Sequence, residues 1–360
     1  MTRRAFVHRL PMRAPDDVSA LEAAMEEGRI DAPSVVAVFG KTEGNGCVND
    51  FTRALATRAL KDALGSAKAS LVMSGGTEGG LSPHCLVFEV REVEDAPRRG
   101  ALAVGAARTA DLPFARLGRL AQVDSVAAGV RAAMASAGIA DAADVHFVQI
   151  KCPLLTADRI AAAGANPATR DTLKSMGLSR AASSLGVAVA LGEVERESLT
   201  EEAIGRDWSL YSSRASASAG VELLDHEIVV LGVAKGWTGP LSIAHAVMQD
   251  AIDIEPVREA LERVGLVARG QLAPEQSERL VALLAKAEAS STGFLRGRRH
   301  TMLNDSDISS TRHARAFVAG ALAGLVGHAE IYVSGGAEHQ GPDGGGPVAV
   351  IVDASPGGRA

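Results

Sequence analysis

A short motif occurs three times in this chain of 360 residues, and the repetition constrains the fold more than any other feature of the sequence. The motif is Ser-x-Gly-x-Glu, and its copies begin at Ser74, Ser218 and Ser334. Each copy precedes an apolar, strand-like segment, and the first and last copies also follow one. The chain is therefore expected to contain three copies of one structural unit.

The residues upstream of each motif extend the repeat. An arginine precedes each serine, a lysine that closes an apolar segment precedes each arginine, and a helix-like stretch precedes each lysine. The arginines are Arg53, Arg180 and Arg315, the lysines are Lys41, Lys151 and Lys286, and the helix-like stretches are 18–25, 126–134 and 257–264. Any one of these pairs is compatible with coincidence, because lysine and arginine are common. The same ordered set of residues, found three times with the same arrangement of strands and helices around it, is not compatible with coincidence.

Each unit reads as a helix, a strand ending in lysine, a helix with arginine, a strand ending in the motif, and a last strand. The predicted units are residues 1–97, 103–240 and 246–360. They are much longer than the ~20–50-residue repeats of solenoids. We therefore expect an α/β protein whose three units close around a common axis.

Composition excludes several classes of protein. With 37 Lys+Arg against 43 Asp+Glu, the net charge of −6 disfavours nucleic-acid binding. No apolar run is long enough to span a membrane, and the first residues lack a signal-peptide pattern, so a cytoplasmic location is expected. The three cysteines form no CxxC pair and the nine histidines form no HxH or HxxxH pair, which disfavours a zinc site.

The repeated residue types suit acyl transfer. A serine is a weak nucleophile that needs a base beside it, and a lysine can serve when burial or a positive neighbour favours its neutral form. An arginine supplies that neighbour and also a planar fork of donors for carbonyl oxygens. The alternative for any single motif is a glycine turn in which the serine bonds its own backbone. Three converging sets would match a flat ring of alternating carbonyl and N–H groups.

At these residues the chain resembles the cyanuric acid hydrolase/barbiturase family of ring-opening amidohydrolases. The resemblance spans nearly the whole chain. The matching stretches are FGKTEGNGCVNDFTR (39–53), VMSGGTEGGLSPH (72–84), HFVQIKCPLLT (146–156), TLKSMGLSRAASSLGVAVALGE (172–193), SSRASASAGVELLDHEIVVLG (212–232) and VSGGAEHQGPDGGGPVAVIVD (333–353). The resemblance implies three homologous repeats around a pseudo-threefold axis, with inner β walls that form a triangular prism or barrel and helices outside.

The resemblance also implies an activity. We expect hydrolytic opening of the cyanuric acid ring to 1-carboxybiuret, which loses carbon dioxide to give biuret. The alternatives are barbituric acid as substrate, giving ureidomalonate, and a protein that binds cyclic imides without turning them over. No organic cofactor is implied, and the expected assembly is a homotetramer.

Residue by residue, the resemblance implies that Lys151 is the catalytic base and Ser218 the nucleophile. The substrate-binding positions that it implies are Arg53, Ser74, Gly75, Arg180, Ser218, Ala219, Arg315, Ser334 and Gly335. Lys41 and Lys286 belong to the two secondary Lys–Ser pairs. Four serines cluster at residues 212–218; the motif register selects Ser218, and Ser216 and Ser213 rank behind it.

The sequence around the lysines agrees with the choice of the middle unit. Lys41 and Lys286 are each followed two residues later by a glutamate, Glu43 and Glu288, whose carboxylate would keep the amine protonated. Lys151 has no such neighbour in sequence. We therefore expect Lys151 to be the lysine that becomes neutral.

A divalent cation is implied near the C-terminal glycine-rich loop. By resemblance it is a structural magnesium or calcium ion held mostly by main-chain oxygens. The implied ligands are Glu288, Ala337, Gln340, Gly341, Pro342 and Gly345. On the sequence alone, a flexible loop is the alternative.

Overall fold

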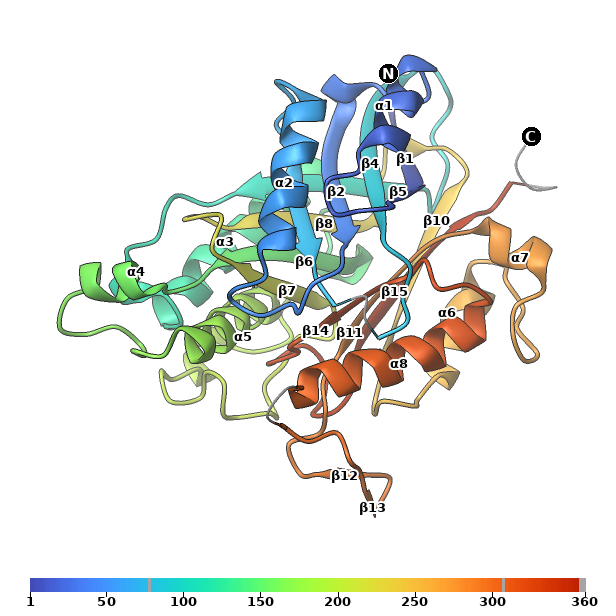
Figure 1. Cartoon of the computed structure of the whole chain (residues 1–360). Helices are drawn as coiled ribbons and strands as arrows, with labels where there is room; N and C mark the ends of the chain where they lie inside the picture. Colours follow the sequence, from blue (N-terminus) through green and yellow to red (C-terminus); the bar gives the residue numbers. More distant parts are fainter. Residues whose placement is uncertain (77–78, 306–307, 356–360) are drawn as a thin grey trace.

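The computed structural model describes residues 1–76, 79–305 and 308–355, which form a mixed α/β molecule built on three β-sheets (Figure 1). The first unit contains β1 (Thr2–Pro11), α1 (Ser19–Glu26), β2 (Val35–Lys41), α2 (Phe51–Leu64), β3 (Ser70–Ser74) and β4 (His84–Val93). The second contains β5 (Leu102–Arg108), α3 (Leu120–Ala137), β6 (Val145–Pro153), α4 (Ala157–Ala162), α5 (Thr172–Ala190), β7 (Ala215–Gly220) and β8 (Glu227–Val233). The third contains β10 (Leu241–Met248), α6 (Glu255–Arg263), α7 (Pro274–Arg279), β11 (Leu280–Ala287), α8 (Ser310–Val326), β14 (Tyr332–Gly335) and β15 (Gly346–Asp353).

Minor elements complete the chain. β9 (Trp237–Thr238) adds to the edge of the first sheet beside β1, and β12 (Phe294–Leu295) pairs with β13 (Arg298–Arg299) in a separate hairpin. Short 3₁₀ helices span Ala32–Ser34, Phe114–Arg116, Ala142–Asp144 and Arg196–Ser198. The predicted helices and strands occur in the predicted order in every unit. Each unit has one further strand at its start, and the second and third units also contain the short helices α4 and α7, which were not predicted.

The three sheets share one topology. The strand orders are β3-β2-β4-β1, β7-β6-β8-β5 and β14-β11-β15-β10, with β9 extending the first. In each sheet the lysine-bearing strand is antiparallel to the last strand of its unit and parallel to the serine-bearing strand. A register shift also falls at the same point of each lysine-bearing strand, directly after Val35, Val145 and Leu280. The repetition therefore extends to a local irregularity of the backbone.

Local sequence explains where the arginine-bearing helices begin and end. Asp50 caps α2 by accepting a hydrogen bond from the Thr52 N–H, and Asp171 caps α5 by accepting one from the Lys174 N–H. Gly327 ends α8 in the left-handed conformation that glycine adopts without steric cost. The two aspartates thus set where α2 and α5 begin, and Gly327 sets where α8 ends.

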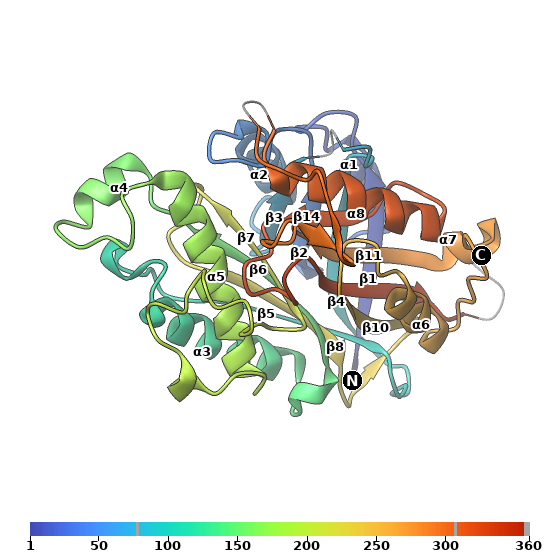
Figure 2. The same cartoon turned by 90° about the horizontal axis from the view of Figure 1, so that it is seen from below.

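Side chains from all three sheets share the central core. Phe39, Phe147 and Tyr332, one from each unit, are fully buried in it. Helices cover the sheets from outside, and α2, α5 and α8 lie around the place where β3, β7 and β14 come together (Figure 2). Within the described residues the sheets do not close into one hydrogen-bonded barrel, because they meet mainly through side chains. The predicted α/β fold of three repeats is confirmed.

Two parts of the sequence prediction lie outside the described residues: Glu78 of the first motif and the final residues 356–360 of the third unit. In the part of the chain that the structure describes, no helix combines the length and the apolar character needed to cross a membrane.

Candidate active site

Each lysine lies directly opposite its serine on the neighbouring parallel strand. The register pairs Lys41 with Ser74. It likewise pairs Lys151 with Ser218 and Lys286 with Ser334. Because both strands of each pair end within two residues of this point, the three pairs occupy the same place in the three units. The sheet register thus brings together residues that lie 33 to 67 positions apart in the chain.

The first and third lysines contact the hydroxyl of their own serine. Lys286 Nζ donates to Ser334 Oγ at 3.1 Å and to the main-chain oxygen of Ala217 at 2.6 Å. Lys41 Nζ lies 3.4 Å from Ser74 Oγ and 2.7 Å from the Gly75 carbonyl oxygen. All three lysines are essentially buried.

The middle lysine has different partners. Lys151 Nζ donates to the main-chain oxygen of Met73 at 3.0 Å and lies 2.8 Å from Glu222 Oε1. The argument that Lys151 lacks a carboxylate neighbour, on which its choice as the lysine that becomes neutral depended, is therefore wrong for the folded protein. The partner is the glutamate of the Ser218 motif, which folds back from the end of β7 and was not recognised because it lies far from Lys151 in sequence.

The expectation that a neighbouring glutamate keeps Lys286 protonated is also wrong. Burial, together with the positive charge of Arg180, lowers the pKa of Lys286 to about 7. The charges of Glu338 and Glu288 raise this pKa, but by less than burial and Arg180 lower it.

The three serines line one cavity with the three arginines. The residues around this central cavity are Gly46, Arg53, Met73, Ser74, Gly75, Met176, Arg180, Ser218, Ala219, Arg315, Ser334 and Gly335. Ser218 Oγ and Ser334 Oγ lie 3.3 Å apart across it. All nine positions predicted to bind substrate are in this set.

The two fallback serines lie elsewhere. Ser213 donates its hydroxyl to the carboxylate of Glu193, and Ser216 is fully buried in the strand below Ser218. Neither lines the central cavity. The motif register was therefore the right guide to the serine that faces the cavity.

Each arginine reaches from its own unit to the motif of the next. Arg53 Nη1 donates to the main-chain oxygen of Ala219 at 3.1 Å. Arg180 of the second unit holds Glu338 of the third through two hydrogen bonds. Arg315 of the third unit lies against Gly76 of the first, where an added Cβ would be 2.3 Å from the guanidinium carbon. The arginines thus link the units in a cycle.

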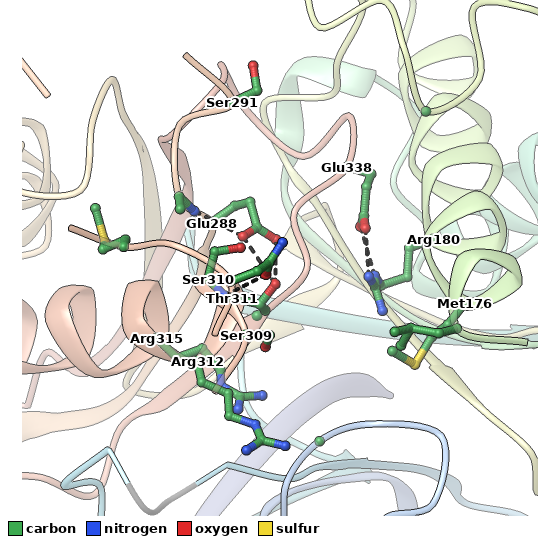
Figure 3. Close-up of a pocket in the computed structure, with 18 of the residues that line it drawn as sticks. Met176, Arg180, Glu288, Ser291, Ser309, Ser310, Thr311, Arg312, Arg315 and Glu338 are labelled. Atoms are coloured by element: carbon green, nitrogen blue, oxygen red, sulfur yellow. Dashed lines mark hydrogen bonds and ion pairs between the residues drawn. The ribbon is translucent and has the colours of Figure 1, made fainter. Parts of the chain in front are cut away.

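A larger cleft adjoins the central cavity. It has a volume of about 710 Å³ and shares Gly46, Met176, Arg180, Arg315 and Gly335 with the cavity. Figure 3 shows this cleft, with Arg180 and Glu338 facing each other and Glu288 joined to Thr311. This cleft leads toward the cavity that the three serines line.

The residues predicted to bind a metal ion lie beside the cleft. Within the described residues, no group of three His, Cys, Asp or Glu side chains could hold a metal ion. Glu288 supplies a carboxylate whose pKa is raised by burial and by Glu338. Gln340 uses its side chain inside the protein, since Oε1 accepts from the Ala217 N–H at 2.7 Å and Nε2 donates to the Gly336 oxygen at 3.1 Å.

The remaining predicted ligands are loop residues. The carbonyl oxygens of Ala337 and Pro342 accept hydrogen bonds from the Gln340 and Gly345 N–H groups, both at 2.9 Å, and the Gly341 N–H donates to Ser212. A carboxylate and main-chain carbonyls form an all-oxygen set, which is the donor chemistry of magnesium and calcium.

One residue at the site was missed altogether. Tyr332 is fully buried, and burial raises the pKa of its hydroxyl, while Ser218 and Ser74 lower it by a smaller amount. It lies two residues before Ser334, so the alternation of side chains along β14 could have placed it on the same face.

The chain is similar to known proteins over nearly its whole length. The family model described as "Amidohydrolase ring-opening protein" matches residues 6–353. Cyanuric acid amidohydrolase from Bradyrhizobium sp. (strain ORS 375) is 63% identical, with 98% of each chain covered. The Methylobacterium sp. (strain 4-46) protein of the same name is 62% identical, again with 98% of each chain covered.

Solved structures are also similar. The crystal structure of a cyanuric acid hydrolase from A. caulinodans matches with a TM-score of 0.91 at 59% identity, covering 98% of this chain and 100% of that one. A second cyanuric acid hydrolase structure matches with a TM-score of 0.93 at 49% identity, with the same coverage.

Proposed function

The chain belongs to the family of ring-opening amidohydrolases, which hydrolyse cyclic amides, and we propose that its own substrate is cyanuric acid. The observation that supports this substrate is the threefold set of Lys–Ser pairs around one cavity. Cyanuric acid presents three equivalent carbonyl groups alternating with three N–H groups. Its ring therefore offers the same polar edge to each of the three units.

The proposed roles of the side chains follow from their chemistry. The serine hydroxyls and the backbone beside Gly75, Ala219 and Gly335 would meet the ring carbonyls. The guanidinium groups of the three arginines would bind the same oxygens, because their planar donor fork matches carbonyl geometry. Negative charge that develops on a carbonyl oxygen would be stabilised in a site where water is scarce.

We assign Ser218 as the nucleophile and Lys151 as the base. Ser218 Oγ attacks a ring carbonyl carbon while Lys151 Nζ takes the hydroxyl proton. The C–N bond then breaks, and the ring nitrogen takes that proton from Lys151. Water hydrolyses the acyl-enzyme in the same manner, with Lys151 taking a proton from water and returning it to Ser218. The product is 1-carboxybiuret, which loses carbon dioxide to give biuret.

The assignment of the middle pair is supported by two features. Ser218 and Lys151 face each other in the strand register, and Ser218 lines the cavity. The Lys286–Ser334 pair is the alternative, since Lys286 contacts its serine and has a pKa of about 7. Separate serine variants distinguish the two pairs, as set out in the Discussion.

The test of the proposed function is direct. The purified protein is incubated with cyanuric acid and with barbituric acid, and biuret, carbon dioxide and ureidomalonate are measured. We expect kcat/KM to be higher for cyanuric acid. A preference for barbituric acid would change the assigned substrate, and binding of either ring without turnover would favour a cyclic-imide binding protein.

We also propose a structural magnesium or calcium ion beside the cleft. Glu288 and the carbonyl oxygens of the 337–345 loop would hold it, and the positive charge would offset the repulsion between the buried carboxylates of Glu288 and Glu338. Metal analysis of the purified protein, with the melting temperature measured before and after treatment with a chelator, tests this ion. A homotetramer in the cytoplasm stays a prediction, and light scattering on the purified protein measures the assembly.

A further inference from the structure

Lys151 lines a second cavity, which is separate from the central cavity that Ser218 lines. This second cavity has a volume of about 260 Å³ and is lined by Thr57, Lys61, Leu71, Arg108, Asp111, Lys151, Glu222, Leu223, Leu224, Asp225 and Glu227. It shares no lining residue with the central cavity. Lys61, Arg108 and Asp111 are exposed, so the cavity leads from bulk water to a buried amine.

Glu222 stands between that water and Lys151. Its Oε1 atom lies 2.8 Å from Lys151 Nζ, and its side chain is 16% exposed whereas that of Lys151 is 1% exposed. Burial raises the pKa of Glu222, but the charge and hydrogen bond of Lys151 outweigh it and lower the pKa to about 2. The Glu222 carboxylate is therefore ionised in the resting protein.

The backbone is shaped to allow this contact. A Cβ added at Gly220 would lie 2.1 Å from Glu222 Oε2. The missing side chain at the end of β7 is what lets the carboxylate fold back onto Lys151. In the third unit the corresponding glutamate, Glu338, binds Arg180 instead. The Lys–Glu contact is thus not a general consequence of the repeat.

We propose that Glu222 is the proton-transfer partner of Lys151 and exchanges that proton with water in the second cavity. The inference rests on the proposed function, and Glu222 acts on the reaction through Lys151. The N–H bond of the ammonium breaks and an O–H bond forms on Oε1, leaving a neutral amine and a neutral carboxylic acid. The carboxylic acid then gives the proton to water, and the amine is ready to accept the Ser218 proton.

Other charges face Glu222 from the elements packed around it. Arg53 of α2 stabilises its carboxylate from the side of the central cavity. Arg108 of β5 pairs with Asp225 and Glu227 at the cavity wall, and Lys61 and Asp111 lie at the rim. These rim groups carry charges of both signs. The proposed exchange of the proton with water therefore does not need one particular residue at the rim.

The test uses one substitution that keeps the size of the Glu222 side chain and one that removes it and leaves space for a small buffer molecule. Glu222→Gln keeps the size of the side chain but cannot accept a proton, and we expect kcat to fall by about a hundred-fold with little change in KM. Glu222→Ala opens space, and formate or imidazole that enters through the cavity should restore kcat in proportion to its concentration. Gly220→Ala displaces the carboxylate without removing it and should also lower kcat.

Two controls separate proton transfer from simple positioning. The same buffers should not restore Ser218→Ala. Glu338→Gln, the equivalent change in the third unit, should raise KM and show no response to buffer.

The outcomes are distinct. Rescue of Glu222→Ala by both formate and imidazole supports the inference, because imidazole accepts a proton but is not an anion. Rescue by formate alone would show that Glu222 only holds Lys151 by charge, and this would overturn the inference. Absence of any rescue would overturn it as well. So would a Glu222→Gln variant with the kcat of the unchanged protein. If the unchanged protein does not hydrolyse cyanuric acid, the proposed function fails and the inference fails with it.

Discussion

Arg180 holds the carboxylate of Glu338 through two hydrogen bonds, from Nε at 2.8 Å and from Nη2 at 2.6 Å, although the two residues belong to different repeats. The pair is buried, and the same guanidinium lies close enough to Lys286 to disfavour its charged form. One arginine thus ties two units together and adds to the effect of burial, which lowers the pKa of Lys286.

Replacing this arginine by lysine tests the importance of the planar fork. Arg180→Lys keeps the positive charge but cannot donate two parallel hydrogen bonds to Glu338. We expect kcat/KM for cyanuric acid to fall by about a hundred-fold, mainly through KM, since this is the size of effect that a lost binding geometry produces. Steady-state kinetics measures it, and circular dichroism confirms the fold. A variant with unchanged KM would show that charge alone is sufficient.

The three serines should differ in their effect on turnover. Ser218→Ala is expected to lower kcat by at least about a thousand-fold, because the nucleophile is lost. Ser74→Ala and Ser334→Ala should act more on KM. Single-turnover assays that trap the acyl-enzyme identify the modified residue. If Ser334→Ala abolishes turnover while Ser218→Ala retains it, the nucleophile belongs to the third unit and Lys286 is the base.

Lys286 should make stability depend on pH. Its pKa is about 7 in the folded protein against 10.5 for an ordinary lysine, so between these values the unfolded chain binds a proton that the folded one does not. The free energy of unfolding therefore rises with pH in this window, by up to about 1.4 kcal/mol per pH unit for one proton. Below pH 7 both states are protonated and the dependence ends.

The measurement compares the protein with Lys286→Met, which has no titrating group there. Denaturant unfolding at several pH values between 6.5 and 9.5 gives the two curves, and other titrations cancel in their difference. We expect the free energy of unfolding of the unchanged protein to rise relative to that of Lys286→Met as the pH rises. Parallel curves would contradict a lowered pKa for Lys286.

Glycines that lie against the arginines should be essential for a steric reason. Gly336 has a φ of +75°, and an added Cβ would be 2.4 Å from the guanidinium carbon of Arg180. Gly336→Ala is expected to cost about 1 kcal/mol of stability for the left-handed backbone and to raise KM by displacing Arg180. Gly28→Ala is the matched control, because Gly28 has a φ of +71° and open space around it. It should show a similar loss of stability with normal kinetics; a KM change in both variants would mean that the effect is not due to Arg180.

The sequence predicted the order of elements because that order follows from local pattern. Apolar segments ending in lysine and helices bearing arginine repeat three times, and the predicted helix-like stretches 18–25, 126–134 and 257–264 overlap α1, α3 and α6. The position of Ser218 in the cavity could also be predicted, since the motif places it at the same strand end as Ser74 and Ser334.

Partners that depend on the packing of side chains could not be predicted in this way. The Lys151–Glu222 pair exists because Gly220 leaves room for a carboxylate to turn back, which is a property of three-dimensional shape. The pKa of Lys286 is lowered first by burial and then by Arg180, which comes from another unit and is 106 positions away. Glutamates close to each lysine in sequence predict neither the Lys151–Glu222 contact nor the lowered pKa of Lys286, although the glutamate of the motif is a repeated residue.

The direction in which the arginines reach has a consequence for how such a chain can be divided. The first unit supplies Arg53 to the second, the second supplies Arg180 to the third, and the third supplies Arg315 back to the first. A fragment that lacks one unit would leave one motif without its donor and one guanidinium without its acceptor. An isolated unit could complete its own site only by assembling head to tail with two further copies, so linking three in one polypeptide frees each copy to acquire a distinct role.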